Sequence, residues 1–260
     1  MRKSKLLSKL GAGKIAKICS MGHFLPFFVR YAAHHGYDAI WLDLEHRMMA
    51  GREVQALLAF CRLYDIDCMV RPPTLERNRL YRYLEDGAAG FLIPFVSDRE
   101  IAEQVVESVK FPPLGNRGLD GAGLDADFGL HPGREGPGYT SEANAQTFVI
   151  AQIETPEAVD KADEIARVRG IDGLFVGTGD LGLRMGARSG GQEGQLDSAI
   201  GKVSVAARDH GKAWGAASGS LESLMRYQKM GAQILPWGSD FLLRQLLATC
   251  SADLAARFPD

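Results

Sequence analysis

Short β-rich apolar runs alternate along the chain with longer segments in which apolar residues recur at helical spacing. The runs lie at residues 15–20, 39–43, 67–71, 90–94, 148–153, 173–176, 213–216 and 233–236. The helical segments lie at residues 53–64, 76–86, 98–109, 156–167, 198–209, 221–230 and 241–256. Strand-then-helix units repeated over this length predict an α/β protein with one (β/α)8 barrel domain spanning residues 1–260.

A doubly wound open sheet is the alternative to a barrel. That fold usually carries a glycine-rich phosphate-binding turn after its first strand, and the segment Ser20-Met-Gly-His-Phe24 lacks the G-x-G-x-x-G pattern. The sequence therefore favours the barrel. Residues 111–144 interrupt the alternation, because they are rich in Gly, Pro and Asp and have no clear period, so we expect a long loop over the barrel mouth.

The composition is typical of a globular enzyme, with 46% hydrophobic and 24% charged residues. The net charge of −2 disfavours nucleic acid as a partner. The four cysteines form no C-x-x-C pair, which indicates reduced thiols and a cytoplasmic protein. The basic N-terminal segment lacks the apolar core of a signal peptide, and no apolar run reaches the length of a membrane span, so we expect no membrane partner.

Two neighbouring apolar runs are followed by a carboxylate, Glu154 after the first and Asp180 after the second. In a parallel barrel the active site lies at the carboxyl ends of the strands, so these two side chains are candidates to bind one divalent cation. Carboxylate oxygens suit Mg²⁺ or Mn²⁺ best, with Co²⁺ or Zn²⁺ as alternatives. The competing interpretation is structural: Glu154 would belong to a helix start at Pro156, and Asp180 would be an N-cap.

Other predicted strand ends carry further reactive groups. Asp43 ends the second run and Glu45 and His46 follow it, and a carboxylate beside an imidazole favours a general base. Arg71 ends the third run and could bind a carboxylate through two nitrogens or stabilise an enolate. A surface ion pair is the alternative role for His46, and a rim salt bridge for Arg71. No predicted strand end carries the lysine of a Schiff-base aldolase, which leaves metal-assisted enolate chemistry.

Roughly residues 5–256 resemble the class II metal-dependent pyruvate aldolases, a family that includes the 4-hydroxy-2-oxoheptanedioate and 2-keto-3-deoxy-sugar-acid aldolases. The matching motifs are Trp41-Leu-Asp-Leu-Glu-His46, Val70-Arg-Pro72, Gly87-Ala-Ala-Gly-Phe-Leu-Ile-Pro94, Pro112-Pro-Leu-Gly-Asn-Arg-Gly118, Gln152-Ile-Glu-Thr-Pro156 and Phe175-Val-Gly-Thr-Gly-Asp-Leu181. The resemblance implies a metal-dependent lyase that reversibly cleaves a 4-hydroxy-2-oxo acid to pyruvate and an aldehyde through a metal-stabilised enolate. It also implies a TIM barrel that exchanges its C-terminal helix with a partner in a homo-oligomer, typically a hexamer.

The resemblance also assigns roles to residues. It implies that Glu154 and Asp180 bind the metal and that Gln152 contacts the substrate or a metal-bound water. The acid/base would be His46, paired with Asp43, and Arg71 would anchor the pyruvyl oxygen. The backbone amides of Gly179 and Asp180 would bind the substrate carboxylate. Glu85, next to Asp86, stands where relatives carry an aspartate that reaches the neighbouring subunit's histidine.

This chain departs from the family pattern at three places. Gly177-Thr-Gly-Asp180 replaces the usual Gly-Pro-Ala-Asp or Gly-Pro-Asn-Asp, which affects the turn expected to bind pyruvate. Leu44 replaces a small residue before Glu45, and residues 121–144 have their own sequence where relatives shape the aldehyde end of the site. Two alternatives therefore stay open: a related metal-enolate lyase, decarboxylase or citrate-type synthase, and a non-catalytic metabolite-binding barrel.

Overall fold

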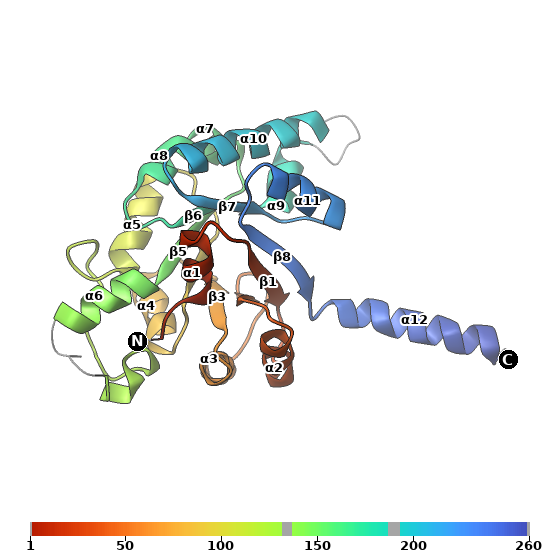
Figure 1. The fold of residues 1–260 in the computed structure, drawn as a ribbon, viewed down its shortest axis with the longest axis horizontal. Helices are drawn as coiled ribbons and strands as arrows, with labels where there is room; N and C mark the ends of the chain where they lie inside the picture. Colours follow the sequence, from red (N-terminus) through yellow and green to blue (C-terminus); the bar gives the residue numbers. More distant parts are fainter. Residues whose placement is uncertain (1, 132–136, 187–192, 259–260) are drawn as a thin grey trace.

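The computed structural model describes residues 2–131, 137–186 and 193–258. Eight parallel strands close into a barrel in the order β1 to β8, with β8 paired to β1 (Figure 1). The strands are β1 Ala16–Met21, β2 Ala39–Asp43, β3 Asp67–Arg71, β4 Gly90–Ile93, β5 Phe148–Ile153, β6 Gly173–Val176, β7 Ala213–Ala216 and β8 Ile234–Ser239. This architecture confirms the predicted (β/α)8 barrel, and five of the strands have the bounds expected from the apolar runs.

Helices alternate with the strands, and α2 to α11 lie around the outside of the barrel (Figure 1). They are α1 Lys5–Gly11, α2 Pro26–His34, α3 Gly51–Leu63, α4 Arg77–Glu85, α5 Arg99–Val109, α6 Pro137–Gln146, α7 Pro156–Asp160, α8 Ala162–Arg167, α9 Thr178–Arg184, α10 Glu193–Asp209, α11 Leu221–Lys229 and α12 Leu242–Arg257, with a 3-10 segment η1 at Leu124–Gly129. The helix expected over residues 156–167 is divided at Lys161, where the backbone leaves the helical region at φ −99° and ψ 8°.

Residues 111–144 differ from the predicted mouth loop, because they contain η1 and lead into α6. The Asn144 side chain bonds to both backbone groups of Phe111, accepting at 2.7 Å and donating at 2.9 Å, which ties α6 to the end of α5 just before β5 begins. Gly123 lies against the backbone carbonyl of Glu85, at the end of α4. The described contacts of η1 and α6 therefore lie near the strand starts, and the expectation of a loop over the mouth is wrong for these two elements.

Buried contacts explain why this segment folds onto the body of the barrel. Asp125 accepts hydrogen bonds from Arg117 at 2.6 Å and from the Tyr139 hydroxyl at 2.7 Å, and all three side chains are buried. Phe111 packs edge-on against Tyr139 beside them. The stabilisation comes from an ion pair and a few aromatic contacts, so no helical period marks it in the sequence.

The barrel is closed at the strand starts and open at the strand ends. Leu6 of α1 is fully buried in the interior cluster with residues such as Met69 and Phe175. Asp67, the first residue of β3, holds this plug in place by accepting hydrogen bonds from the Ser4 hydroxyl at 2.7 Å and the Leu6 amide at 2.9 Å. The strand ends are therefore the face at which a site can form.

The helix α12 projects away from the barrel and has no buried residue (Figure 1). Five of its leucines are exposed, namely Leu242, Leu243, Leu246, Leu247 and Leu254. Exposed leucines at this spacing form an apolar stripe without a partner in the single chain. Among the helices that the structure describes, none combines the length and the apolar content needed to cross a membrane.

Candidate active site

Arg71 lies at the centre of one half of the barrel mouth. The register of β2 and β3 places it directly beside Asp43. Its guanidinium binds Asp43 through two nitrogens, Nε to Oδ1 at 3.0 Å and Nη2 to Oδ2 at 2.8 Å, and its Nη1 lies 3.1 Å from Glu45 Oε2. Its Cζ also lies 4.9 Å from the centre of the Trp41 ring. Two carboxylates and an aromatic ring therefore hold Arg71 in one orientation, as an anion-binding group requires.

Burial and the charge of Arg71 act in opposite directions on the two carboxylates. Burial would raise the pKa of Asp43, but the hydrogen bonds and charge of Arg71, together with contributions from His46, outweigh burial and hold that pKa below its usual value. At Glu45, burial outweighs the attraction of Arg71 and the pKa is raised. Asp43 is therefore the permanent ionic partner of Arg71, and Glu45 is the carboxylate that is more easily protonated.

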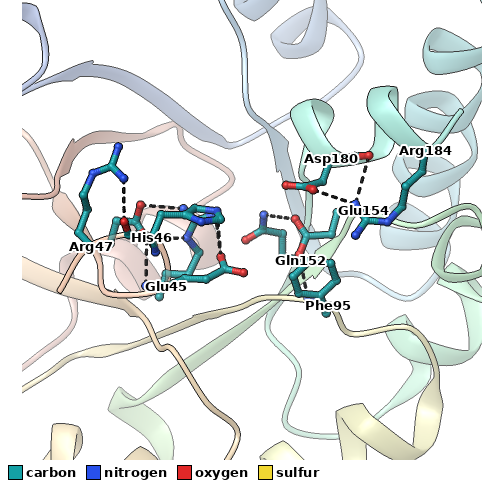
Figure 2. A network of polar contacts seen from close by, with 10 residues as sticks. Glu45, His46, Arg47, Phe95, Gln152, Glu154, Asp180 and Arg184 are labelled. Atoms are coloured by element: carbon teal, nitrogen blue, oxygen red, sulfur yellow. Dashed lines mark hydrogen bonds and ion pairs between the residues drawn. The ribbon is translucent and has the colours of Figure 1, made fainter. Parts of the chain in front are cut away.

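His46 follows these residues, and its side chain is about half exposed, at 51%. We expected the His46 imidazole to pair with Asp43. In the structure Asp43 Oδ1 instead accepts a hydrogen bond from the backbone amide of His46 at 3.3 Å. The imidazole Nε2 instead lies 3.6 Å from Glu45 Oε2 (Figure 2). The reason is that Arg71 engages both oxygens of Asp43, which leaves Glu45 as the carboxylate that faces the ring.

Glu154 lies across the mouth from this cluster, at the end of β5, and is only 1% exposed. Its Oε1 accepts a hydrogen bond from the Phe95 amide at 2.8 Å, and its Oε2 accepts one from Gln152 Nε2 at 2.5 Å (Figure 2). Burial raises the pKa of Glu154 to about 7. The Phe95 amide opposes this rise, whereas the charges of Glu45 and Asp180 add to it. Since these charges influence one another, the two halves of the mouth form one site.

Asp180 completes the acidic side of the site from the first turn of α9. Its Oδ1 lies 2.8 Å from Arg184 Nη1, and the Arg184 guanidinium stacks on Phe95 at 5.1 Å from the ring centre (Figure 2). The Asp180 side chain is 37% exposed, so its second oxygen can reach a ligand. Arg184 thus links Asp180 to the same residue whose amide binds Glu154.

This set of oxygens fits a hard divalent cation. Glu154 and Asp180 supply two carboxylates, and the buried Oε1 of Gln152 has no hydrogen-bond partner in the structure. Burial is the main cause of the raised pKa of Glu154, and the charges of Glu45 and Asp180 add to it; a divalent ion would favour the ionised carboxylate. Within the described residues no three acidic, histidine or cysteine side chains form a ready ligand group, so substrate and water would have to supply further ligands.

The turn from Gly177 to Asp180 is ordered despite lacking the family's proline. The Thr178 hydroxyl donates to the Ala217 carbonyl at 3.1 Å, which anchors the turn to the end of β7. A Cβ on Gly177 would lie 2.6 Å from Glu154 Oε2, so only glycine allows the carboxylate to approach this closely. The first intrahelical bond of α9 comes from the Leu181 amide, and the Gly179 and Asp180 amides are left without intrahelical partners.

Glu85 does not lie at this site in the single chain. It is the last residue of α4, and the charges that act on it are those of Arg117, Asp125, Asp120 and Asp86. Burial raises its pKa. Asp86, in contrast, lines with His46 a surface hollow of about 730 Å³ beside the mouth.

Three features of the site escaped the sequence reasoning. The Phe95 amide is a backbone donor, and a backbone group leaves no side-chain signal. Arg184 stands four residues after Asp180 on a helix, a spacing that predicts an ion pair. Glu45 was placed at the mouth by its strand, but its contact with Arg71 depends on the neighbouring strand.

Comparisons with known proteins identify the family of this chain. Residues 22–244 match the family described as HpcH/HpaI aldolase/citrate lyase. A hydroxypyruvate/pyruvate aldolase from Roseovarius nubinhibens is 31% identical over 251 residues, which cover 95% of this chain and 96% of that protein. A 4-hydroxy-2-oxo-heptane-1,7-dioate aldolase from Escherichia coli is 32% identical over 223 residues, covering 86% and 82% of the two chains.

Solved structures are similar over nearly the whole chain. An HpcH/HpaI aldolase from Desulfitobacterium hafniense has a TM-score of 0.89 at 30% identity, covering 98% of this chain and 97% of its own. A citrate synthase has a TM-score of 0.82 at 27% identity, with 99% and 98% covered. Because the family model matches residues 22–244, the chain belongs to the HpcH/HpaI aldolase/citrate lyase family.

Proposed function

We propose that this protein is a metal-dependent aldolase that reversibly cleaves a 4-hydroxy-2-oxo acid to pyruvate and an aldehyde. The observation that carries the proposal is the buried carboxylate of Glu154. Its pKa is raised to about 7 by burial, and it lies beside Asp180 and across from Arg71. Relatives named as pyruvate and hydroxy-oxo-acid aldolases support the same reaction class.

Glu154 and Asp180 would hold the cation, with Mg²⁺ or Mn²⁺ the best match to their oxygens. When bound, this cation supplies Lewis-acid stabilisation of an enolate. The unpaired Gln152 Oε1 is directed at the same region and would orient the substrate or a water molecule. The Gly179 and Asp180 amides, in the turn that Thr178 anchors, would bind the substrate carboxylate.

The other half of the mouth would handle charge and protons. Arg71 is held by Asp43 and Glu45, so its guanidinium can stabilise the developing negative charge on the 2-oxo oxygen without first reorganising. His46 would take the proton of the 4-hydroxyl group as the carbon–carbon bond breaks, and its Nε2 lies 3.6 Å from Glu45 Oε2.

Exchange of the pyruvate methyl protons with D₂O tests this proposal, because it requires only the metal site and the enolate. We expect exchange and pyruvate release from 4-hydroxy-2-oxo acids to depend on Mg²⁺ or Mn²⁺. Both activities should be lost in Glu154→Gln and Asp180→Asn, which should remain folded. Glu157→Gln, an exposed acid in the same region, is the matched control.

Exchange that persists in chelator would contradict the metal assignment. Exchange absent with every metal would favour a metabolite-binding barrel, and citrate formation without pyruvate release a citrate-type synthase.

We also propose a homo-oligomer in which α12 is exchanged between protomers, with a hexamer as the assembly that the family resemblance implies. An apolar groove of about 530 Å³ lies beside α11 and the paired strands β1 and β8. Its lining includes Ile15, Leu224, Met225 and Leu235. The exposed leucines of α12 have the complementary apolar character and lack partners in the single chain. Because α12 projects away from its own barrel, the groove on a second copy is where it can be buried (Figure 1).

Light scattering on variants of α12 tests this arrangement. Leu247→Glu, in the leucine stripe, is expected to give smaller species than the native protein, because a charge would have to enter the apolar groove. Ala252→Glu, which helical spacing places on the opposite face, should leave the assembly unchanged. A native protein that is monomeric at micromolar concentration would contradict the exchange.

A further inference from the structure

A second histidine, His23, is held by a buried carboxylate at the rim of the mouth. Asp240 Oδ2 lies 3.0 Å from each of the backbone nitrogens of Gly22 and His23 and 2.8 Å from His23 Nδ1. The Asp240 side chain is fully buried, whereas the His23 side chain is 55% exposed. Asp240 therefore fixes the ring through Nδ1, and Nε2 is left for a ligand.

Arg47 lies beside this histidine without a carboxylate partner among the described residues. Its Nη1 donates to the His46 carbonyl at 2.7 Å. Its Cζ lies 4.8 Å from the centre of the Phe241 ring, and the His23 ring lies 5.0 Å from the same ring. The absent side chain of Gly22 makes room for this arrangement, since a Cβ there would lie 2.9 Å from Arg47 Cγ. His23 and Arg47 thus flank one aromatic ring, and in the described part of the chain neither His23 Nε2 nor the Arg47 guanidinium has an anionic partner.

The His23–Arg47 pair lies one layer above the catalytic groups and on their side of the barrel. Met21 of β1 pairs with Leu42 of β2, so the next residues, Gly22 and His23, rise beside Asp43 and its successor. Figure 2 shows Arg47 next to His46, opposite Asp180 and Arg184.

A cavity of about 350 Å³ is lined by residues of β1, β2, β8 and α12 and of the segment after β7. Its lining includes Trp41, the ring on which Arg71 stacks, and Ser239, the residue before Asp240. No residue lining this cavity carries a charge. Through Trp41 and Ser239 the cavity borders the neighbours of both Arg71 and Asp240, and it gives a substrate uncharged space on this side of the mouth.

We propose that His23 and Arg47 form a subsite for an anionic group, a carboxylate or a phosphate, at the far end of the aldehyde half of the substrate. His23 would donate from Nε2 while Asp240 accepts from Nδ1, and Arg47 would add a charge-assisted hydrogen bond. Asp240 is a positioning residue in this arrangement. The proposal rests on the proposed aldolase function, because it assigns the second half of that substrate.

Aldol addition of pyruvate with Mn²⁺ tests the subsite. Succinic semialdehyde and glyceraldehyde 3-phosphate carry the anion, and butanal and glyceraldehyde are their neutral counterparts. We expect Arg47→Gln and His23→Gln to lower kcat/KM for an anionic aldehyde roughly 10- to 100-fold, with changes below about threefold for the neutral ones. Arg52→Gln, an exposed arginine at the start of α3, is the control for a general loss of charge.

Proton exchange of pyruvate, measured in the same samples, separates this subsite from the proposed function. If the native enzyme does not exchange the pyruvate protons, the proposed function itself is overturned. If the native enzyme exchanges protons but shows no preference for anionic aldehydes, the subsite is overturned. The same holds if the variants exchange protons but lose kcat/KM equally for all aldehydes. A preference limited to the semialdehyde identifies a carboxylate as the group bound, and one limited to the phosphorylated aldehyde identifies a phosphate; either supports the subsite.

Discussion

Replacing Glu154 by glutamine is expected to stabilise the metal-free protein at alkaline pH. Burial raises the pKa of this carboxyl from 4.5 to about 7, and the Phe95 amide only partly opposes the rise. Because the pKa is higher in the folded protein than in the unfolded chain, the associated stabilisation is complete in acid and is lost as the pH rises through about 7. Above that pH the native protein carries a buried charge that the variant lacks.

The size of the effect follows from the shift in pKa. A rise from 4.5 to about 7 corresponds to about 3 kcal/mol in the free energy of unfolding once the group is ionised in both states. For a chain of this size this corresponds to an increase in Tm of roughly 6–12 °C. The glutamine can keep its contacts, because its oxygen can accept from Phe95 and its amide can donate to the unpaired Oε1 of Gln152 after that side chain flips.

Urea denaturation in chelator at pH 5.5 and 8.5, at one protomer concentration, measures this difference. The variant should be more stable at pH 8.5, and its advantage should shrink at pH 5.5. Other buried carboxylates with raised pKa, such as Asp172, contribute equally to both proteins and cancel in the comparison. Added Mn²⁺ should reverse the order, since only the native protein binds it. A variant that is equally stable or less stable at pH 8.5 would refute the reasoning.

Three further substitutions test particular contacts. Arg71→Lys is expected to lower kcat for pyruvate release about 100-fold while the circular dichroism spectrum stays native, because lysine cannot bind two carboxylates with three fixed nitrogens; near-native kcat would contradict this role. Gly177→Ala should weaken Mn²⁺ binding at least tenfold in a calorimetric titration, since its Cβ would lie 2.6 Å from Glu154 Oε2. Gly179→Ala, with open space around its Cβ, should bind Mn²⁺ as the native protein does. Asp67→Ala should lower the free energy of unfolding by about 2–4 kcal/mol in urea, because it leaves the buried donors of α1 unpaired; a smaller loss would mean that α1 contributes little to stability.

Most of the barrel could be predicted because its strands are buried on both faces. Strands of this kind appear as continuous apolar runs, such as residues 148–153, and the chain marks their ends with polar residues. The strand-end rule then placed Glu154, Asp180, Asp43 and Arg71 at the mouth, which is where the structure has them.

The contacts within the site were less predictable, because they depend on competition between neighbours. Asp43 and Glu45 are both close enough in sequence to pair with His46; Arg71 binds both oxygens of Asp43, and the imidazole faces Glu45 Oε2. The positions of η1 and α6 were mispredicted for a related reason, since the Arg117–Asp125 pair that holds η1 near the strand starts has no local signature.

Local pattern was thus enough to define the strands, the residues at their ends and the enolate chemistry that those residues suggest. Closure of the barrel determined which of these residues contact one another. His23 and Asp240 are 217 positions apart and come together only because β8 returns to pair with β1. Likewise, the pKa of Glu154 is raised by burial and by charges from two other strand ends, which exist only in the closed barrel. Hydrophobic periodicity acts over a few residues, whereas electrostatic fields and hydrogen bonds act across space, so only the tertiary structure determines the site.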